Sequence, residues 1–565
     1  MKKIISTTIT NKLKKLDQLI KETPNTVPNV YSHTFNFKGR KSPLVAHAVI
    51  KELLNKNESF YDPFAGSGSF LLAGADISNH IYATELDNYA YFAFNSLIAD
   101  IDIDKVKNMF SSIKNSVYED INHLYRTNCC GNKLMISKLY FDPDKGDKGY
   151  FQPSKNRDIT NGENIKFVHN CKTCGKSKKK FDNSDLQVIQ ELSKYDISEF
   201  PTTKYIDNSR INITSSKDAD QYDRIFTTRS KIALLKLQKA ILKFPSSKER
   251  DFLEQALVST LTLSRICSYG SSSDILYYVV HEKAQESNVW ELFETKYLNS
   301  LKFREQYSDE IRLLNHNLHY VNCDYSMFIN ENPDLKIDLI YTDFPYTDQV
   351  PYLERHQLYR VWLEKFYNEK QFALTKNMLN SEIVVTNAPS RKNKNSLMSY
   401  YGDIDKMFNN FYKVLSDNGL LFFTLNLGKA KYFKTFLEIV NLARKNGFEL
   451  VYQNTIKKND PSLRKQSAFV NTLMDDILVG FAKLNDQEKY WYIENDNYEF
   501  VIIKIIYQYI LSSMSKSQIV TKTSAVQLIK NDMRSKYSII ATDNDIEKIN
   551  NIINSNFNVI NGIIN

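Results

Sequence analysis

The sequence predicts an α/β protein with a doubly wound, Rossmann-like sheet that a large insertion divides into two parts. Three observations support this: a strand–turn–helix–strand–helix run before residue 102, renewed alternation of strands and helices from residue 316, and a Lys- and Asn-rich stretch between them. Such alternation is typical of a largely parallel sheet with helices on both faces. The 565 residues exceed what one compact core holds, so we expect several domains.

Local patterns place the elements of the first half. Leu44, Val45, Ala48, Val49 and Leu53 recur at helical spacing, which predicts one apolar helix face. The segments S-F-Y-D and H-I-Y-A-T-E-L-D are then typical of strands, and F-L-L-A-G-A-D and A-Y-F-A-F-N-S-L-I-A-D are typical of helices. A tight Gly-rich turn, P-F-A-G-S-G-S, joins the first strand to its helix.

The second half repeats this design. Buried strands are predicted at H-Y-V-N-C-D, I-D-L-I-Y-T-D and L-L-F-F-T-L-N, and a closing pair at F-E-L-V-Y-Q-N-T-I and M-D-D-I-L-V-G-F-A-K. Two helices are predicted to end at Gly419 and Gly447, because glycine is a favoured residue after a helix. Within the insertion, R-S-K-I-A-L-L-K-L-Q-K-A-I-L-K-F and K-E-R-D-F-L-E-Q-A-L-V-S-T-L-T-L-S-R-I-C predict long helical segments.

Four regions follow from these patterns. Residues 1–102 hold a helical lead-in and the first half of the α/β domain, and residues 103–315 form the insertion. Residues 316–485 hold the second half of the domain. Residues 486–565 are rich in Asn, Ile and Lys and predict a helical C-terminal region without a chemical motif.

Composition narrows the class of protein. A net charge of +9 suits a polyanionic partner, since Lys and Arg displace counterions from phosphates. The N-terminus lacks the apolar stretch of a signal peptide, and no run of about 18 apolar residues predicts a membrane span. We therefore expect a cytoplasmic protein with no membrane partner. The 6 cysteines of such a chain indicate a metal site more than a disulfide framework.

The Gly-rich turn has the features of a ligand site. Residues Asp62–Gly68 join a strand to a helix, where glycines admit a ligand close to the backbone and the helix N-terminus offers free N–H groups. Glu85 ends the next strand, where an acid can accept hydrogen bonds from both ribose hydroxyls. Leu71 replaces the third glycine of a dinucleotide motif, and no P-loop lysine follows. The alternative is an ordinary turn with a surface glutamate.

A second motif ends a later strand. Asp343-Phe344-Pro345-Tyr346 follows D-L-I-Y-T, and the alternative interpretation is an ordinary turn. This tetrapeptide resembles the D-P-P-Y motif of amino-group DNA methyltransferases, with Phe344 in place of a proline. D-P-F-A-G-S-G-S similarly resembles their cofactor motif, and N-F-K-G-R-K-S-P resembles the segment that closes over the methionine end of the cofactor.

The resemblance implies S-adenosylmethionine as cofactor and assigns residues to it. The acid Glu85 would bind the ribose, and Asp324, at the end of another strand, would meet the adenine amino group unless it only caps a helix. The cofactor-binding residues implied are Lys41, Ser42, Pro43, Asp62, Pro63, Phe64, Gly66, Ser67, Gly68, Glu85 and Asp324.

The tetrapeptide suits methyl transfer to an exocyclic amine, whose lone pair is delocalised into the ring. The Asp343 carboxylate and the carbonyl of Phe344 or Pro345 can each accept one amine hydrogen, which favours a tetrahedral nitrogen. Pro345 stiffens the turn, and Tyr346 would stack on a base flipped out of the duplex. An initial Asp leans toward adenine N6 within this family, and cytosine N4 is the alternative.

Four cysteines of the insertion form two short pairs, Cys129-Cys130 and Cys171-x-x-Cys174, each followed by glycine. Four thiolates suit tetrahedral zinc, although the first pair lacks the usual two intervening residues. His123 or His169 could replace one ligand, and four unliganded cysteines are the alternative.

Together these features resemble prokaryotic adenine-specific DNA methyltransferases with a zinc ribbon, over about residues 30–483. The resemblance implies a Rossmann-like methyltransferase domain, double-stranded DNA as partner, a target-recognition role for the insertion, and a restriction–modification or defence setting. Any restriction endonuclease or defence-system subunit would be a separate chain. RNA or protein methylation, or a catalytically silent nucleic-acid-binding relative, are the alternatives.

Overall fold

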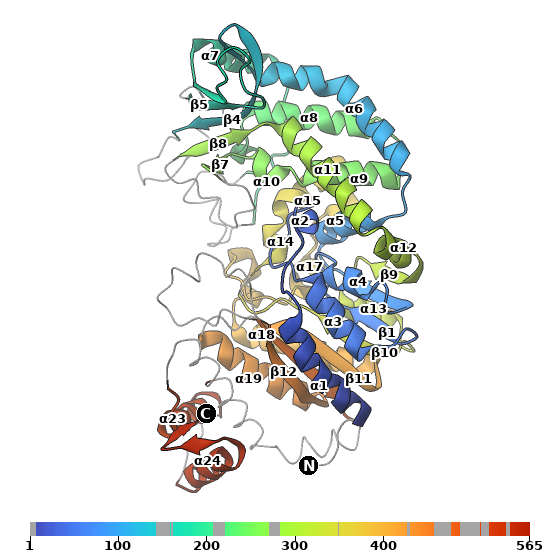
Figure 1. The fold of residues 1–565 in the computed structure, drawn as a ribbon, viewed down its shortest axis with the longest axis vertical. Coiled ribbons are helices and arrows are strands. Elements are labelled where there is room, and N and C mark those ends of the chain that lie inside the picture. Colours follow the sequence, from blue (N-terminus) through green and yellow to red (C-terminus); the bar gives the residue numbers. More distant parts are fainter. Residues whose placement is uncertain are drawn as a thin grey trace.

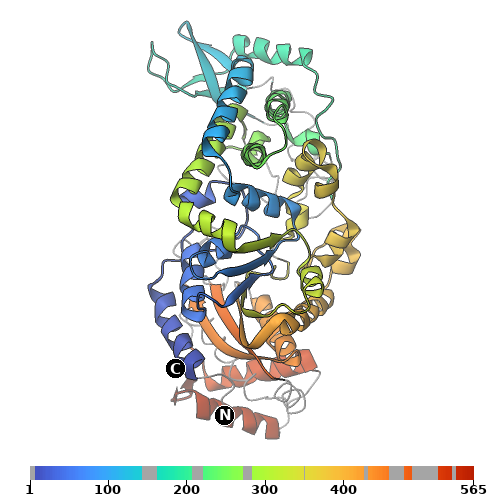
Figure 2. The same ribbon diagram turned by 90° about the vertical axis from the view of Figure 1, so that its right-hand side faces the viewer.

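A computed structural model gives the fold of most of the chain (Figure 1). The residues it describes are 7–142, 159, 162–206, 221–270, 283–348, 350–425, 430–456, 476–485, 509, 519–537 and 543–564. A large sheet occupies one part of the elongated molecule and a small sheet lies at one end, with helices between them (Figure 1, Figure 2). None of the helices in these described ranges is both long and apolar enough to span a bilayer.

The large sheet draws its strands from both halves of the chain. Its 7 strands are β1 (Ser59–Asp62), β2 (His80–Thr84), β9 (Leu318–Val321), β10 (Ile337–Thr342), β11 (Leu415–Leu425), β12 (Phe448–Ile456) and β13 (Asp476–Lys483). Their order across the sheet is β12-β13-β11-β10-β1-β2-β9. Six strands run in one direction, and β13 runs antiparallel to them. The predicted mixed α/β fold with a mostly parallel central sheet is thus confirmed.

Alternate residues of the strands face two hydrophobic cores. Phe60 and Leu339 belong to one core, whereas Tyr61 and Ile340 belong to the other. This alternation follows from the two-residue period of a strand, and it requires helices on both faces. The first core is covered by α1 (Thr7–Glu22), α3 (Pro43–Leu53), α4 (Ser69–Gly74) and α12 (Ser308–Asn317), and the second by α13 (Tyr325–Glu331), α18 (Leu397–Val414) and α19 (Ala430–Lys445).

The insertion builds the small sheet, in the order β6-β5-β4-β8-β7, with β3 paired to β4. These strands are β3 (Arg126–Cys129), β4 (Asn132–Phe141), β5 (Gly162–Phe167), β6 (Lys178–Lys180), β7 (Cys267–Ser268) and β8 (Ala284–Ser287). The accompanying helices are α6 (Ile103–Leu124), α7 (Asn183–Glu191), α8 (Thr228–Leu242), α9 (Lys248–Val258), α10 (Leu261–Ser264) and α11 (Val289–Gln306).

Short helices connect these parts. They are α2 (Asn29–Ser32), α5 (Asn88–Ile98), α14 (Tyr352–Arg355), α15 (Gln357–Phe366), α16 (Glu369–Phe372) and α17 (Lys376–Ser381), with 3-10 turns η2 (Leu192–Lys194), η3 (Tyr222–Ile225) and η4 (Pro389–Lys394). Near the C-terminus, α23 (Lys522–Tyr537) and α24 (Asp543–Asn556) share a small core with the hairpin β14 (Val559–Ile560) and β15 (Ile563–Ile564). The predicted helical C-terminal region therefore also contains strands, and residues 486–508 lie outside the described ranges.

Two sequence predictions about helices are wrong in detail. The helix expected to end at Gly419 ends at Val414, and Gly419 lies within β11. Tertiary hydrogen bonds explain the change, because the Ser416 hydroxyl donates to the Asp338 carboxylate (2.9 Å) on the neighbouring strand. The segment K-E-R-D to S-R-I-C forms two helices, α9 and α10, instead of one long helix.

The apolar face expected on α3 is rotated. Leu44 is 43% exposed, whereas Val45, Val49 and Leu53 are buried as expected. The helix begins at Pro43, after Ser42, whose hydroxyl accepts a hydrogen bond from the Val45 N–H (3.4 Å). This start directs the face containing Val45 toward the sheet. The helix predicted to end near Gly447 does end at Lys445, and Gly447 has a positive φ of 91°.

Candidate active site

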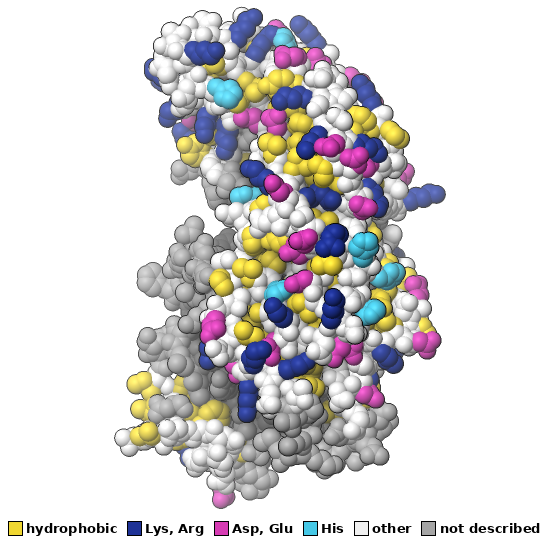
Figure 3. Space-filling model, turned by 45° about the vertical axis from the view of Figure 1, so that its right-hand side comes forward, with side chains coloured by type: hydrophobic (Ala, Val, Ile, Leu, Met, Phe, Trp, Pro, Cys, Tyr) yellow, Lys and Arg dark blue, Asp and Glu magenta, His cyan; other side chains and the backbone are white. Residues whose placement is uncertain are grey.

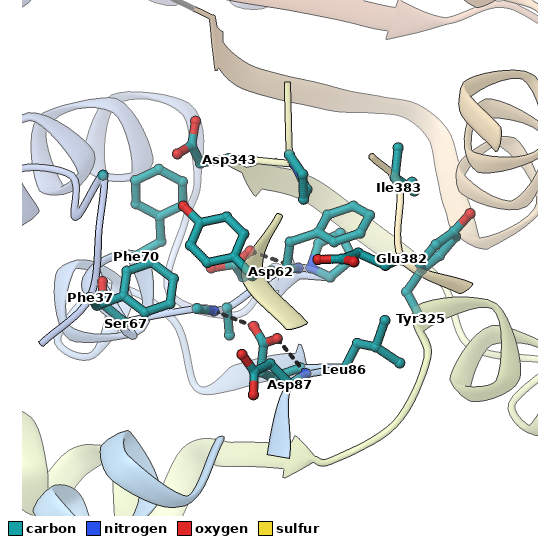
Figure 4. A pocket seen from close by; sticks show the side chains of 18 of the residues that line it. Phe37, Asp62, Ser67, Phe70, Leu86, Asp87, Tyr325, Asp343, Glu382 and Ile383 are labelled. Carbon is teal, nitrogen blue, oxygen red and sulfur yellow. Dashed lines mark hydrogen bonds between the residues drawn. The ribbon is translucent and has the colours of Figure 1, made fainter. Parts of the chain in front are cut away.

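The carboxyl ends of β1, β2, β9 and β10 meet around one cavity that is open to solvent. The empty space inside this cavity and at its mouth amounts to about 840 Å³. In an open α/β sheet, ligands bind where the strand order reverses, here between β1 and β10. Figure 4 shows Phe37, Ser67 and Phe70 on one side of this cavity, with Tyr325, Glu382 and Ile383 on the other. Of the residues assigned from sequence, those lining it are Lys41, Asp62, Pro63, Phe64, Gly66, Ser67, Glu85, Asp324, Asp343 and Pro345.

The Gly-rich turn is held against the sheet by its backbone. Gly66 and Gly68 have positive φ values of 51° and 82°, a conformation that side chains rarely adopt. A Cβ on Gly68 would lie 2.3 Å from the Phe94 ring, and one on Gly66 would lie 2.8 Å from Phe37. Glycine is therefore required at both positions.

Glu85 is the acid that the sequence placed after β2, and the structure makes it an acceptor tied to the turn. Its carboxylate accepts hydrogen bonds from the N–H groups of Gly66 (2.6 Å) and Asp87 (2.8 Å). Burial raises the pKa of Glu85 to about 8, and the nearby Asp87 carboxylate adds to this effect. The side chain thus lines the cavity with its carboxylate oriented by two backbone donors.

Asp62 is buried at the end of β1, between the turn and β10. Its carboxylate accepts hydrogen bonds from the Thr342 hydroxyl (2.6 Å) and the Phe64 N–H (3.2 Å). Burial raises the pKa of Asp62 to about 7, although these two hydrogen bonds by themselves would lower the pKa. Asp62 therefore links the Gly-rich turn to the strand that ends at Asp343.

Lys41 pairs with two carboxylates beside the cavity. Its Nζ lies 3.3 Å from Oδ1 of Asp343 and 3.4 Å from Oδ2 of Asp476, the first residue of β13. Burial disfavours the ammonium, but the two carboxylates more than compensate and raise the pKa of Lys41. The resemblance implied a place near the cofactor for Lys41, and the structure adds that Lys41 contacts the first residue of the tetrapeptide.

The tetrapeptide divides between the cavity and the core. Asp343 and Pro345 line the cavity, and Asp343 is 28% exposed. Phe344 is buried, with its ring 4.9 Å from Phe423. Tyr346 is also buried at 7% exposure and is not among the cavity-lining residues, so the structure does not present its ring for the predicted base stacking.

Asp324 is both a cavity residue and a helix cap. Its carboxylate accepts a hydrogen bond from the Ser326 N–H (2.8 Å) at the start of α13. The two interpretations that the sequence left open are therefore compatible. Ser42 and Pro43 begin α3 and do not line the cavity, and neither does Gly68 at the start of α4.

Other lining residues were not found from sequence. Tyr352 stacks on Phe37 with ring centroids 5.0 Å apart, and its hydroxyl donates to the Lys38 carbonyl (2.8 Å). Glu382 is buried, and burial raises its pKa although Arg391 lies 2.6 Å away. These residues come from a connection after β10 whose position depends on tertiary packing. The only local signal was the segment P-Y-L-E-R that follows the tetrapeptide.

The four cysteines of the insertion converge at a candidate metal site. Cys129 ends β3, Cys130 follows it in the β3–β4 turn, and Cys171 and Cys174 belong to a tight turn after β5. Their sulfur atoms all lie within 4.8 Å of one another, an arrangement that could hold a metal ion. A backbone N–H hydrogen bond from Cys174 lowers the pKa of the Cys171 thiol to about 7, whereas burial and the neighbouring sulfur atoms raise the pKa of Cys129.

The backbone explains why the unusual first pair can contribute. Cys130 and Gly131 have positive φ values of 50° and 78°, so the β3–β4 turn brings consecutive cysteines to the same site. Neither His123 nor His169 belongs to this cluster within the described residues, and His123 contacts Arg126 instead.

Two sequence comparisons with known proteins supply no relative. No protein-family model matches the chain, and no match was found among curated proteins. A functional assignment therefore rests on the chemistry of the cavity and the cysteine site.

Proposed function

We propose that this protein is an S-adenosylmethionine-dependent DNA methyltransferase that acts on an exocyclic amine, with adenine N6 as the target. One observation supports this most strongly: the Gly-rich turn, Glu85 and Asp343 line the same cavity, although they lie far apart in the sequence. A surface glutamate and an unrelated turn would have no reason to converge at the position where doubly wound sheets bind ligands.

The sheet supports a Rossmann-like methyltransferase domain over a dinucleotide-binding one. Counted along the chain, its parallel strands lie in the order third, second, first, fourth and fifth, as in doubly wound domains. The antiparallel β13, inserted between β11 and β12, departs from a parallel dinucleotide-binding sheet. The absence of the third glycine at Leu71 agrees with this departure.

The cavity residues fit the proposed cofactor. Gly66 and Gly68 have no side chains, which lets the rings of Phe37 and Phe94 pack directly against the turn. Glu85 and Asp324 both line the cavity. The Glu85 carboxylate would accept hydrogen bonds from the ribose hydroxyls, and Asp324 would accept one from the adenine amino group. The cofactor would supply a methyl group on a sulfonium with a good leaving group.

Asp343 would act on the target amine. A carboxylate here can accept one amine hydrogen, and a backbone carbonyl of the tetrapeptide the other. The Pro345 carbonyl already accepts a hydrogen bond from the Tyr400 hydroxyl (3.2 Å), which favours the Phe344 carbonyl as second acceptor. Lys41 would hold the Asp343 carboxylate in place and keep it ionised, so that geometry supplies much of the rate.

The function is tested by incubating the purified protein with duplex DNA and methyl-labelled S-adenosylmethionine, then digesting the DNA. We expect label on N6-methyladenine. Label on N4-methylcytosine would keep the mechanism and change the base. Absence of label on DNA of varied sequence, with cofactor binding intact, would favour RNA or protein as substrate, and absence of cofactor binding would overturn the proposal.

We also propose that the four cysteines hold a structural zinc ion. Sulfur atoms at the usual Zn–S distance in a tetrahedron lie roughly 3.8 Å apart. Sγ of Cys129 lies 3.8 Å from that of Cys174 and 3.9 Å from that of Cys130. Without a metal, four thiols would gain little stability from lying this close together. The distances between the sulfur atoms therefore favour a bound zinc ion.

Cys174→Ser should reduce bound zinc from about one ion per chain to a small fraction, because serine is a poor zinc ligand. Elemental analysis of the purified protein measures the ratio. Cys323→Ser is the matched control, since Cys323 lies outside the cluster, and it should retain zinc. Equal zinc content in the two variants would contradict the site.

A further inference from the structure

The outer face of the small sheet has an unusual arrangement of charge. Lys138 on β4 is directly opposite Lys166 on β5, which is directly opposite Lys178 on β6. Three lysines therefore form a row across three adjacent strands, which we call the lysine row. Neighbouring strands are about 4.8 Å apart, so the row spans roughly 10 Å.

The strand pattern places this row on the outside of the sheet. Leu139 and Ile165, adjacent to Lys138 and Lys166, are buried on the inner face. Lys166 and Lys178 are exposed and Lys138 is half-buried. Lysine and arginine side chains gather at this end of the molecule (Figure 3).

Like charges directly opposite each other destabilise a sheet. In the described part of the chain no ion pair involves any member of the lysine row, whereas the intervening Lys179 points away and pairs with Asp182 (2.7 Å) and Asp185 (2.9 Å). The fold thus neutralises Lys179, whereas the Glu291 carboxylate attracts Lys166 without forming an ion pair with it. An external polyanion would supply further negative charge to the row.

Aromatic and amide side chains continue the same face. Tyr140 lies two residues beyond Lys138, opposite Asn164, which is itself opposite Lys180. The Tyr140 ring lies 4.9 Å from that of Tyr269, which is 61% exposed. Lysines that can bind phosphates beside tyrosines and amides that can contact sugars and bases are typical of a nucleic-acid surface.

We propose that this face of the small sheet, centred on the lysine row, binds the phosphate backbone of duplex DNA and holds the substrate for the cavity. The choice of duplex DNA rests on the proposed function. A duplex offers one negative charge per about 1.7 Å of its axis, so a row of this length meets several phosphates at once. The cysteine site, at the start of β4 and after β5, would keep the strands in register.

The test uses the full chain and a fluorescein-labelled DNA duplex, with affinity measured by anisotropy at several salt concentrations. In the variant K138Q/K166Q/K178Q we expect the affinity to fall roughly tenfold or more near physiological salt. We expect the slope of log affinity against log salt to become shallower by about three. The thermal midpoint should not fall, because repulsion is removed.

A matched control removes the same charge elsewhere. The variant K51Q/K56Q/K302Q replaces three exposed lysines from other surfaces and should keep most of the salt slope. Equal losses in the two variants would mean that only net charge matters and would overturn the inference, as would unchanged binding in the first variant. Tighter binding of duplex RNA than of DNA would also overturn it.

The outcome is separable from that of the proposed function. Wild-type protein that binds DNA through the row but transfers no methyl group would sustain this inference and count against the methyltransferase. Cofactor binding, measured by calorimetry without DNA, should be the same in wild type and in K138Q/K166Q/K178Q, and a loss there would indicate misfolding of that variant. In that case the single substitution K166Q must make the salt slope shallower by about one, or the inference is wrong.

Discussion

Asp343→Ala should abolish most methyl transfer, lowering kcat by about a thousandfold or more while cofactor affinity changes little. The carboxylate is the proposed acceptor for one hydrogen of the target amine, and it lies at the cavity with 28% of its side chain exposed. Alanine removes this acceptor without adding bulk. Steady-state transfer of labelled methyl groups to DNA, together with calorimetric cofactor binding, measures both quantities.

Asp334→Ala is a suitable control, because Asp334 is an exposed aspartate shortly before β10. It should leave kcat within about twofold, as surface substitutions usually do. A stability measurement accompanies both variants, since Lys41 loses one of its two carboxylate partners in Asp343→Ala. Full activity of a correctly folded Asp343→Ala protein would contradict the role of the tetrapeptide.

At about pH 9, where most of Glu85 is ionised, Glu85→Gln should weaken cofactor binding about a hundredfold, because hydrogen bonds to a charged acceptor contribute roughly 1.5–3 kcal/mol each. The carboxylate already accepts the N–H groups of Gly66 and Asp87, so an amide would also place a donor against a donor. Calorimetry with S-adenosylmethionine measures the loss. Glu331→Gln, at the exposed end of α13, should bind the cofactor like wild type.

Because the pKa of Glu85 is raised, both the stability of the protein and its affinity for the cofactor should depend on pH. Burial raises the pKa of Glu85 from 4.5 to about 8 in the folded protein. Its contribution to stability is therefore fully present below about pH 4.5 and is lost as the pH rises through about 8. Cofactor binding should change in the opposite direction and strengthen between pH 6 and 9, roughly the range centred on this pKa, because the ionised carboxylate is the better acceptor.

Glu85→Gln separates this titration from that of Asp62, whose pKa of about 7 lies in the same window. The variant should bind the cofactor with a flatter pH dependence than wild type and lose less stability from pH 6 to 9. A wild-type affinity that is constant over this range would mean that Glu85 is already ionised in the free protein or does not contact the cofactor.

The helices, strands and turns that surround the site could be predicted from local sequence alone. Strand S-F-Y-D, the Gly-rich turn and the following helix were found because apolar spacing and glycine act over a few residues. Asp343 was placed at the end of a strand for the same reason. The convergence of the two cysteine pairs was also predicted, although only the positive φ of Cys130 explains how consecutive cysteines meet at one site.

Tertiary structure decided which side chains those elements present to one another. The resemblance implied that Tyr346 would stack on a flipped base, yet the structure buries Tyr346 in the second hydrophobic core. The contact of Lys41 with Asp343 joins residues separated by the whole insertion, and no local pattern encodes such a pair.

The lysine row illustrates the same limit. Each lysine is an ordinary charged residue of its own strand, and only the register between strands sets Lys138, Lys166 and Lys178 side by side. Register depends on hydrophobic residues of the inner face and on turns elsewhere in the chain. The sequence by itself therefore determined the class of fold and the chemistry available, whereas the spatial partners of each charged group were decided by long-range packing, because electrostatic contacts depend on distance in space and not along the chain.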